Sequence, residues 1–162
     1  MCRTKEPTLI QLNCPYCKAP TRIVDAQVVY RRPGFGRLLI CSTYPACDAY
    51  VGLHSDRTDA KGSLARGPLR RLRRKCHDLF DPLWEHETPL HRWQAYEAAA
   101  KYLGLPVFHI GELDECAAKK FIAEFPAFRA WLLRRIQRRS ARQARKSTRT
   151  AVQTSATAVV AA

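Results

Sequence analysis

The sequence predicts an α+β protein with a small antiparallel sheet, then a compact helical bundle and a disordered basic tail. Two cysteine pairs flank a glycine-containing turn in the first third of the chain, a pattern typical of a metal-stabilised hairpin. Apolar residues then recur at steps of three and four, which predicts amphipathic helices. The last segment holds mainly small, polar and basic residues and has too little apolar surface to pack. We therefore expect three parts, at residues 1–60, 61–139 and 140–162.

The predicted sheet is built around one hairpin. Residues 22–32 are rich in β-branched residues and predict a strand. Residues 33–36 (Pro-Gly-Phe-Gly) predict a turn, because two glycines permit positive φ. The returning strand is expected at residues 37–41 and a third short strand at residues 49–53.

Four helices with one shared apolar core are predicted in the second part. Pro68 is suited to the first turn of a helix, and Asp81-Pro82 is expected to end that helix. Thr88 is expected to cap the second helix and Gly104 to end it. The four helices are predicted at about 68–81, at 88–104, at 113–125 and from Pro126 onward.

Four cysteines form the strongest functional signal. Cys14 and Cys17 are two residues apart and suit one tight turn, whereas Cys41 and Cys47 follow the hairpin. Four thiolates form the closed tetrahedral shell that zinc prefers at structural sites, with no open position for a catalytic water. Residues 1–60 are therefore predicted to be a zinc ribbon that one structural Zn²⁺ ion helps to fold.

The segment from Cys14 to Cys47 resembles the C-terminal zinc ribbons of type IA DNA topoisomerases. The resemblance rests on the Cys-Pro-x-Cys pair and on residues 41–47 (Cys-Ser-Thr-Tyr-Pro-Ala-Cys). In that family the ribbons bind single-stranded DNA or protein partners and do not catalyse, which implies the same role here. Lys18 is a departure, since a glycine often follows the first pair, and the hairpin insert is long.

A wider pattern covers most of the chain. It joins the cysteine pairs to residues 47–54 (Cys-Asp-Ala-Tyr-Val-Gly-x-His), to residues 77–84 (His-x-x-Phe-Asp-Pro-Leu-Trp) and to shorter matches at 67–70, 92–96 and 109–111. This order resembles a family of uncharacterised zinc-finger-containing proteins of phages and prophages. The resemblance implies a phage or prophage origin and a zinc ribbon joined to helices, and it supplies no mechanism.

The charge distribution favours a polyanionic partner. The chain has 28 Lys and Arg against 14 Asp and Glu, for a net charge of +14. Residues 61–75 hold seven basic and no acidic groups, and residues 131–162 hold eight basic and none acidic. Such blocks attract nucleic acid, and single-stranded DNA is favoured because arginines hold phosphates while aromatic rings stack on bases. The candidate contacts are Arg22, Arg31, Arg32, Phe35 and Arg37 on the hairpin, Tyr44 between two cysteines, and Arg70, Arg71, Arg73, Arg74 and Lys75 on the first helix.

Several alternatives stay open. Tyr44 also suits packing over the metal knuckle. A protein-interaction module that modulates host or phage nucleic-acid machinery is the rival function, since zinc ribbons serve both purposes. We expect no enzyme; a metal-dependent nuclease is the alternative, with acids near histidines, which also suit helix capping. The residues of that cluster are Asp78, Asp81, Glu85 and Glu87 with His77, His86 and His91.

The remaining expectations concern place and partners. The sequence has no apolar run of the length of a membrane span and no signal peptide, so a cytoplasmic protein without membrane contact is expected. No small-molecule substrate is evident. His54 suits a surface position better than support of the metal, and His109 and Cys116 suit core or cap positions better than half of a second metal site.

Overall fold

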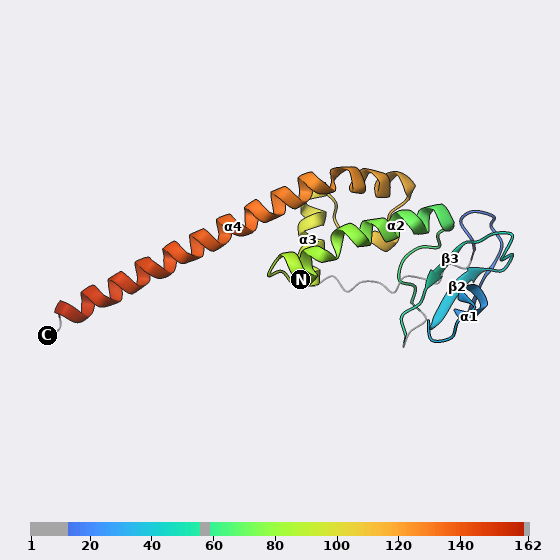
Figure 1. The fold of residues 1–162 in the computed structure, drawn as a ribbon, viewed down its shortest axis with the longest axis horizontal. Helices are drawn as coiled ribbons and strands as arrows, with labels where there is room; N and C mark the ends of the chain where they lie inside the picture. The colour runs from blue at the N-terminus through green and yellow to red at the C-terminus, as the bar shows by residue number, and fades with distance from the viewer. Residues whose placement is uncertain (1–12, 56–58, 161–162) are drawn as a thin grey trace.

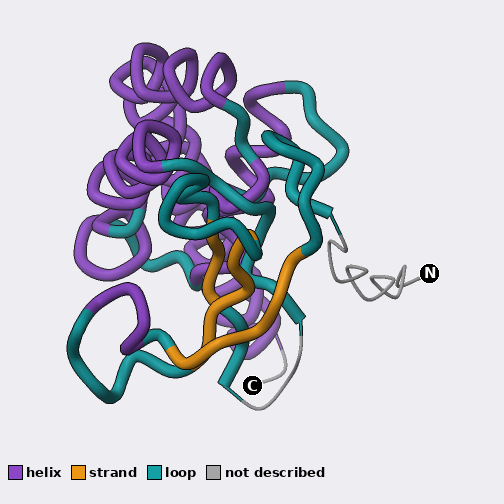
Figure 2. Tube along the Cα trace, turned by 90° about the vertical axis from the view of Figure 1, so that its right-hand side faces the viewer, coloured by secondary structure: helices purple, strands orange, loops and turns teal. Residues whose placement is uncertain are grey.

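The computed structural model describes residues 13–55 and 59–160, and it has the α+β architecture that the sequence predicts (Figure 1). A three-stranded sheet precedes the helices along the chain. Figure 2 views the molecule from the sheet side, with the helices behind the strands. The elements in order are β1 (Thr21–Asp25), α1 (Gln27–Tyr30), β2 (Arg37–Cys41), β3 (Tyr50–Gly52), α2 (Gly67–Phe80), the π-helical turn η1 (Leu83–Glu87), α3 (Arg92–Leu103), the 3-10 turn η2 (Ile110–Glu112) and α4 (Glu115–Val160).

The sheet is antiparallel with β2 at its centre. Thr21 of β1 pairs with Cys41 of β2, and Ile40 pairs with Tyr50 of β3. The predicted turn is confirmed, because Gly34 and Gly36 have φ of 89° and 73°, values that favour glycine.

The first strand is shorter than predicted, because the chain leaves the sheet after Asp25. The Asp25 carboxylate accepts a hydrogen bond of 2.7 Å from the Gln27 backbone N–H and so supports the turn into α1. Arg31 ends α1 in the left-handed region with φ of 57°. The β-branched residues of 22–32 therefore serve a strand and a helical turn, where the sequence predicts one strand.

The helix α2 begins and ends where the sequence predicts, with a proline in its first turn and Asp81-Pro82 after it. The start of α3 differs from the prediction. Thr88 does not cap α3, since its hydroxyl donates to the Leu83 carbonyl and closes η1. His91 is the N-cap, in a reciprocal capping box with Gln94. Gly104 ends α3 with φ of 66°, as predicted.

The two helices predicted on either side of Pro126 form one helix, α4. A proline inside a helix removes one backbone hydrogen bond, and here the loss is tolerated because both sides of Pro126 are anchored. Phe121 and Phe125 before it and Phe128 and Leu132 after it are all buried in the helical core. Tertiary packing therefore overrides the local breaker.

Residues 140–160 belong to the segment predicted to be a disordered tail, and in the structure they continue the helix α4. The helix runs on through residues 140–160 and projects beyond the body of the molecule (Figure 1). Residues 141–146 consist of alanine, arginine, glutamine and lysine alone, all of which have high helix propensity, and this preference favours a helix there even without a core. Residues 141–146 are all exposed.

The helices and the sheet have separate apolar cores. Phe80 lies at the centre of the helical core, with the rings of Tyr96, Phe108, Phe121 and Phe128 within 6.3 Å of its own, centroid to centroid. The sheet has two smaller clusters, one of which contains three of the four predicted metal ligands. The sheet therefore has few apolar residues of its own, and a structural metal is the expected source of its stability.

Candidate functional site

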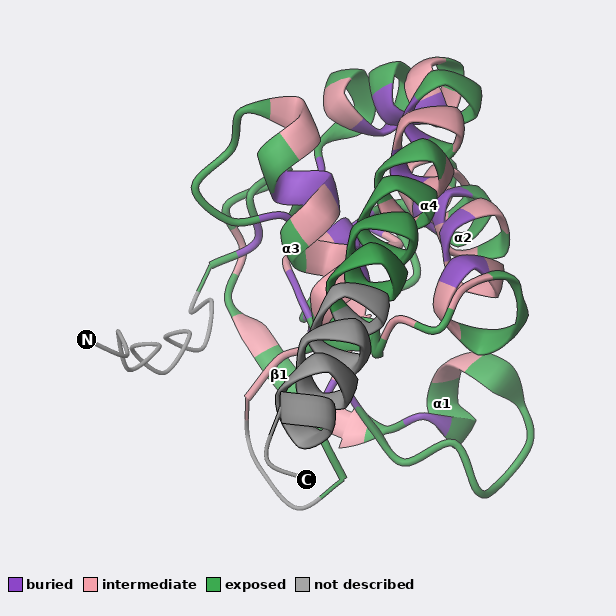
Figure 3. Ribbon diagram, turned by 90° about the vertical axis from the view of Figure 1, so that its left-hand side faces the viewer, coloured by how far each residue is buried: buried purple, intermediate pink, exposed green. Residues whose placement is uncertain are grey.

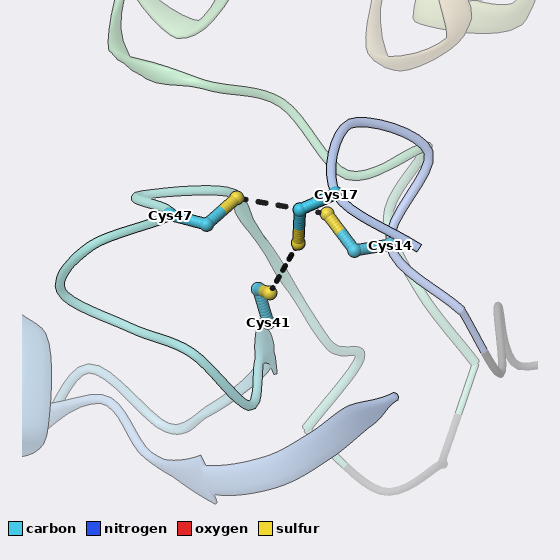
Figure 4. A group of neighbouring side chains, drawn as sticks. All are labelled: Cys14, Cys17, Cys41 and Cys47. Carbon is cyan, nitrogen blue, oxygen red and sulfur yellow. Dashed lines mark hydrogen bonds between the residues drawn. The ribbon is translucent and has the colours of Figure 1, made fainter. Parts of the chain in front are cut away.

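The four predicted metal ligands converge in the structure. The sulfur atoms of Cys14, Cys17, Cys41 and Cys47 all lie within 4.8 Å of one another (Figure 4). Cys14 and Cys47 are 3.7 Å apart, and Cys17 and Cys41 are 3.3 Å apart, measured between sulfurs. Tetrahedral zinc places its sulfur ligands about 3.8 Å apart, because each Zn–S bond is about 2.3 Å long. These distances are too long for disulfides, so the cluster fits one structural zinc ion.

The first cysteine pair lies on a tight turn. Lys18 follows this pair with φ of 63°, in the left-handed region where glycine is favoured. This is the position at which the sequence departs from the topoisomerase ribbons. The turn is closed by a hydrogen bond of 2.8 Å from the Cys14 backbone N–H to the Ala19 carbonyl. The backbone at this position therefore adopts, with a lysine, a conformation that glycine favours.

The surroundings of the thiols differ. The backbone N–H of Ala19, followed by hydrogen bonds with Cys41 and Thr43, lowers the pKa of Cys17 to about 6. Burial raises the pKa of Cys47 to about 11. Cys17 is exposed and the other three cysteines are buried. A bound divalent cation deprotonates its thiol ligands, so zinc is able to hold all four sulfurs as thiolates in spite of these differences.

The zinc cluster is joined to α2 through Asp48, the residue after Cys47. The Asp48 carboxylate accepts a hydrogen bond of 2.8 Å from the Gly67 backbone N–H at the start of α2. Arg70 donates to this carboxylate, and also to the backbone carbonyls of Asp48 and Ala65. The Arg70 guanidinium also lies 3.7 Å from the centroid of the Tyr50 ring. These contacts fix α2 relative to the sheet.

In the interior, Arg73 links α2 to the segments that contain Leu113 and Ser63. Its side chain donates hydrogen bonds of 2.8 Å to the carbonyls of Leu113 and Ser63 and to the Ser63 hydroxyl. Arg73 is 8% exposed, and burial lowers the pKa of its guanidinium. The sequence predicts Arg70 and Arg73 as nucleic-acid contacts. In the structure both guanidinium groups donate to acceptors of the protein itself, and neither residue lines the groove between α2 and the hairpin.

The other three basic residues of α2 are exposed, and one of them faces a groove. Arg74 lines a groove of about 500 Å³ between α2 and the hairpin, whereas Arg71 and Lys75 lie outside its lining. Two aromatic residues, Tyr30 and Phe35, form one wall, with ring centroids 5.3 Å apart. The lining residues are Tyr30, Arg32, Phe35, Arg37, Leu38, Gly52, Leu53, Lys61 and Arg74.

Four residues singled out in the sequence meet in this groove: Arg32, Phe35, Arg37 and Arg74. The sequence pattern does not single out Tyr30 or Lys61 as candidates. Tyr30 is placed in the wall because α1 interrupts the expected strand, and its signal was an aromatic residue directly before two arginines. Partial burial, followed by the neighbouring Tyr50, raises the pKa of Tyr30 to about 12, so its phenol is neutral at physiological pH.

The remaining hairpin candidates lie outside the groove. Arg22 and Arg31 are exposed and do not line it. Tyr44 is half-buried and packs against the sheet cluster of Ala26, Leu38 and Ile40, which favours the packing alternative for this ring.

Several of the histidines and acids of the nuclease alternative have ion-pair partners. His77 and Asp81 are 3.1 Å apart on successive turns, and Glu87 accepts from Arg129 at 2.6 Å. Across residues 13–55 and 59–160, the four cysteines are the group of ligands arranged to hold a metal ion. His54, His109 and Cys116 are not part of that group. The ring of His109 lies beside Tyr96, 6.2 Å between centroids.

A search of the described helices finds none with the length and apolarity needed to span a membrane. Searches of curated proteins and of solved structures gave no significant match. A family of zinc-finger-containing domains, DUF3268, matches residues 10–126, which include all four cysteines, the groove and most of the helical core. The chain therefore belongs to the DUF3268 family of zinc-finger-containing domains.

Proposed function

We propose that this protein binds single-stranded nucleic acid, with DNA favoured, in the groove between the hairpin and α2, and that it catalyses no reaction. The observation that carries the proposal is the composition of the groove. Two aromatic rings and four cationic side chains line it, and none of its nine lining residues is acidic. Single-strand binding sites combine these same two parts, a basic track for the backbone and aromatic faces for the bases.

The two kinds of side chain have separate roles in this proposal. Phe35 lies at the turn tip and is 58% exposed, so its ring is accessible to a base. Arg32, Arg37, Lys61 and Arg74 surround the ring with positive charge for the phosphates. The groove presents no recognition helix for base edges, so we expect little sequence specificity.

Zinc supports this groove through β2. Cys41 lies at one end of β2, and Arg37 and Leu38 at the other end line the groove. The metal therefore fixes the strand that carries part of the binding surface, and its proposed role is structural.

The origin and cellular place belong to the same proposal. The residue pattern shared with phage and prophage proteins supports a phage or prophage gene whose product acts in the host cytoplasm. The six cysteines among the described residues are all free, which suits a reducing compartment.

The proposal is tested by exchanging one exposed aromatic residue at a time. We expect Phe35→Ala to weaken binding of a fluorescent oligo-dT strand by roughly tenfold, because base stacking contributes about 1–3 kcal/mol per base. Trp93→Ala is the matched control, since Trp93 is 64% exposed on α3 and does not line the groove. Anisotropy titrations of zinc-loaded protein measure both. Equal losses, or no loss with Phe35→Ala, would contradict the proposal.

A second candidate function, interaction with a protein, is favoured by a different groove. This groove of about 440 Å³ lies between α3 and α4, and Leu90, Trp131 and Ile136 are among the apolar residues that line it. Lys101, Arg135 and Arg139 on its lining favour an acidic partner. A tagged protein that retains one stoichiometric partner after nuclease treatment would favour this candidate over the nucleic-acid proposal.

A further inference from the structure

We propose that the exposed part of α4, residues 134–146, is a second binding surface whose ligand is duplex DNA. This segment contains seven cationic residues, and residues 131–162 contain no acidic one. All seven are exposed. They are Arg134, Arg135, Arg138, Arg139, Arg142, Arg145 and Lys146.

The cations lie on one side of the helix. Successive helical residues are rotated by about 100°, so these seven positions all fall within an arc of about 140°. The opposite side carries small or uncharged residues, including Gln137, Ser140 and Ala144. A helix that needed charge only for solubility would have no reason to place every cation on one side. The one-sided arrangement instead indicates a surface that is apposed to a polyanion.

The charge pattern is unfavourable without a ligand. Arg138 and Arg142 are one turn apart, as are Arg135 and Arg139, and like charges at this spacing destabilise a helix. Acidic residues at such spacings would relieve the repulsion, and this segment has none. Phosphates placed along the basic side would remove the repulsion and release condensed counterions.

Duplex DNA fits this surface better than a single strand does. Residues 134–146 contain no aromatic residue on which an unpaired base could stack. A helix with side chains is about 10–12 Å wide, and the major groove of B-DNA is about 12 Å wide. A basic arc of about 140° would face the phosphates along the groove while the uncharged side faces solvent. The major groove of duplex RNA is too narrow and deep for this docking.

This surface is distinct from the groove of the proposed function and does not rest on it. The groove is formed by the hairpin and α2, whereas α4 projects away from the sheet toward the opposite end of the molecule (Figure 1). Figure 3 is seen from the end toward which α4 projects, and it shows the turns of α4 that follow its packed part as exposed. Duplex binding by α4 and single-strand binding by the groove can therefore fail independently.

The test compares the wild-type protein with two variants in α4. The first removes charge: Arg138→Gln, Arg142→Gln and Arg145→Gln. The second moves the same three charges to the opposite side without changing composition. It combines Arg138→Gln with Gln137→Arg, Arg142→Ser with Ser140→Arg, and Arg145→Ala with Ala144→Arg. Circular dichroism and zinc content verify that both variants stay folded.

The readout is anisotropy of a fluorescent DNA duplex of about two helical turns, titrated over a series of NaCl concentrations. We expect both variants to bind roughly tenfold more weakly at low salt, and the slope of log K against log[salt] to fall by about 3, one unit per lost phosphate contact. Wild-type affinity in the charge-moved variant would overturn the proposal, since net charge alone would then explain binding. Absence of duplex binding by the wild-type protein would overturn it too and would favour an acidic protein as ligand.

Discussion

Arg73 and Arg74 are neighbours on α2, yet their guanidinium groups have opposite environments. Arg73 is buried and donates to two carbonyls and a hydroxyl, whereas Arg74 is exposed and lines the groove. When a buried acceptor loses its donor, no hydrogen bond compensates for its desolvation, and the free energy of unfolding falls. One residue of this pair therefore has a role in stability and the other, in our proposal, a role in binding.

We predict that alanine substitutions separate these two roles. Arg73→Ala should lower the free energy of unfolding by about 3 kcal/mol, because the Leu113 and Ser63 acceptors lose a charged donor. Arg74→Ala should change it by less than about 0.5 kcal/mol and should weaken binding of single-stranded DNA. Urea unfolding and anisotropy titrations measure the two quantities. Similar stabilities for the two variants would show that the Arg73 network has no structural role.

The sequence separates these two arginines only in part. Arg73 has the helical spacing of Leu69, Cys76 and Phe80 on the apolar side of α2, whereas Arg74 is rotated by about 100° toward the polar side; composition gives both the same charge. What buries the Arg73 guanidinium is the loop at Ser63 and the segment at Leu113, which close over one side of α2. Leu113 lies 40 positions and Ser63 lies 10 positions from Arg73 along the chain, and no local sequence pattern predicts these two contacts. The four cysteines were predictable, because their spacing reports the metal chemistry directly.

At the scale of elements, the strand β2 connects the metal site to the groove. Its last residue is the metal ligand Cys41, and its first residues line the groove. Asp48, which follows the ligand Cys47, accepts hydrogen bonds from Gly67 and Arg70 and so joins the cysteine cluster to α2, the helix that carries Arg74. The groove is therefore formed by the hairpin and α2, and the metal site helps to fix the position of one relative to the other.

We predict that removal of zinc unfolds the sheet and leaves most of the helical core. The sheet clusters are small and contain the cysteines, whereas the helical core around Phe80 is separate and well packed. Structural zinc contributes folding free energy directly, so its loss should disorder strands β1 to β3. Backbone amide NMR spectra before and after chelation measure this, and single-strand binding should be lost in parallel. Retention of the strand resonances in metal-free protein would contradict a structural role for zinc.

The element boundaries show where sequence patterns succeed and where they fail. The second strand and the first helix were predicted closely, since a Gly-containing turn and a proline mark their starts. Residues 26–31 were expected to be strand, but local hydrogen bonding at Asp25 turns them into α1. Pro126 was expected to divide two helices, but burial of Phe125 and Phe128 holds the helix together across it. The first failure has a local cause, a side-chain hydrogen bond to the backbone, and the second a tertiary one, the burial that overrides the preference of proline.

The whole molecule combines a zinc-dependent sheet, a packed helical core and a long basic helix. Arg70 and Arg73 fix the sheet to the core. The two proposed binding surfaces lie at opposite ends, with the single-strand groove beside the sheet and the basic side of α4 away from it. The net charge of +14 was visible in the sequence, but its division into buried links, a groove and a one-sided helix required the fold.

The central claim is that single-stranded nucleic acid binds between the hairpin and α2. Amide NMR of the zinc-loaded protein during titration with an oligo-dT strand tests it most directly. We predict chemical-shift changes concentrated at Tyr30–Arg37, at Leu38, Gly52, Leu53 and Lys61, and around Arg74, with the largest at the turn that carries Phe35. Changes confined to α4, or an unchanged spectrum at saturating oligonucleotide, would contradict the claim.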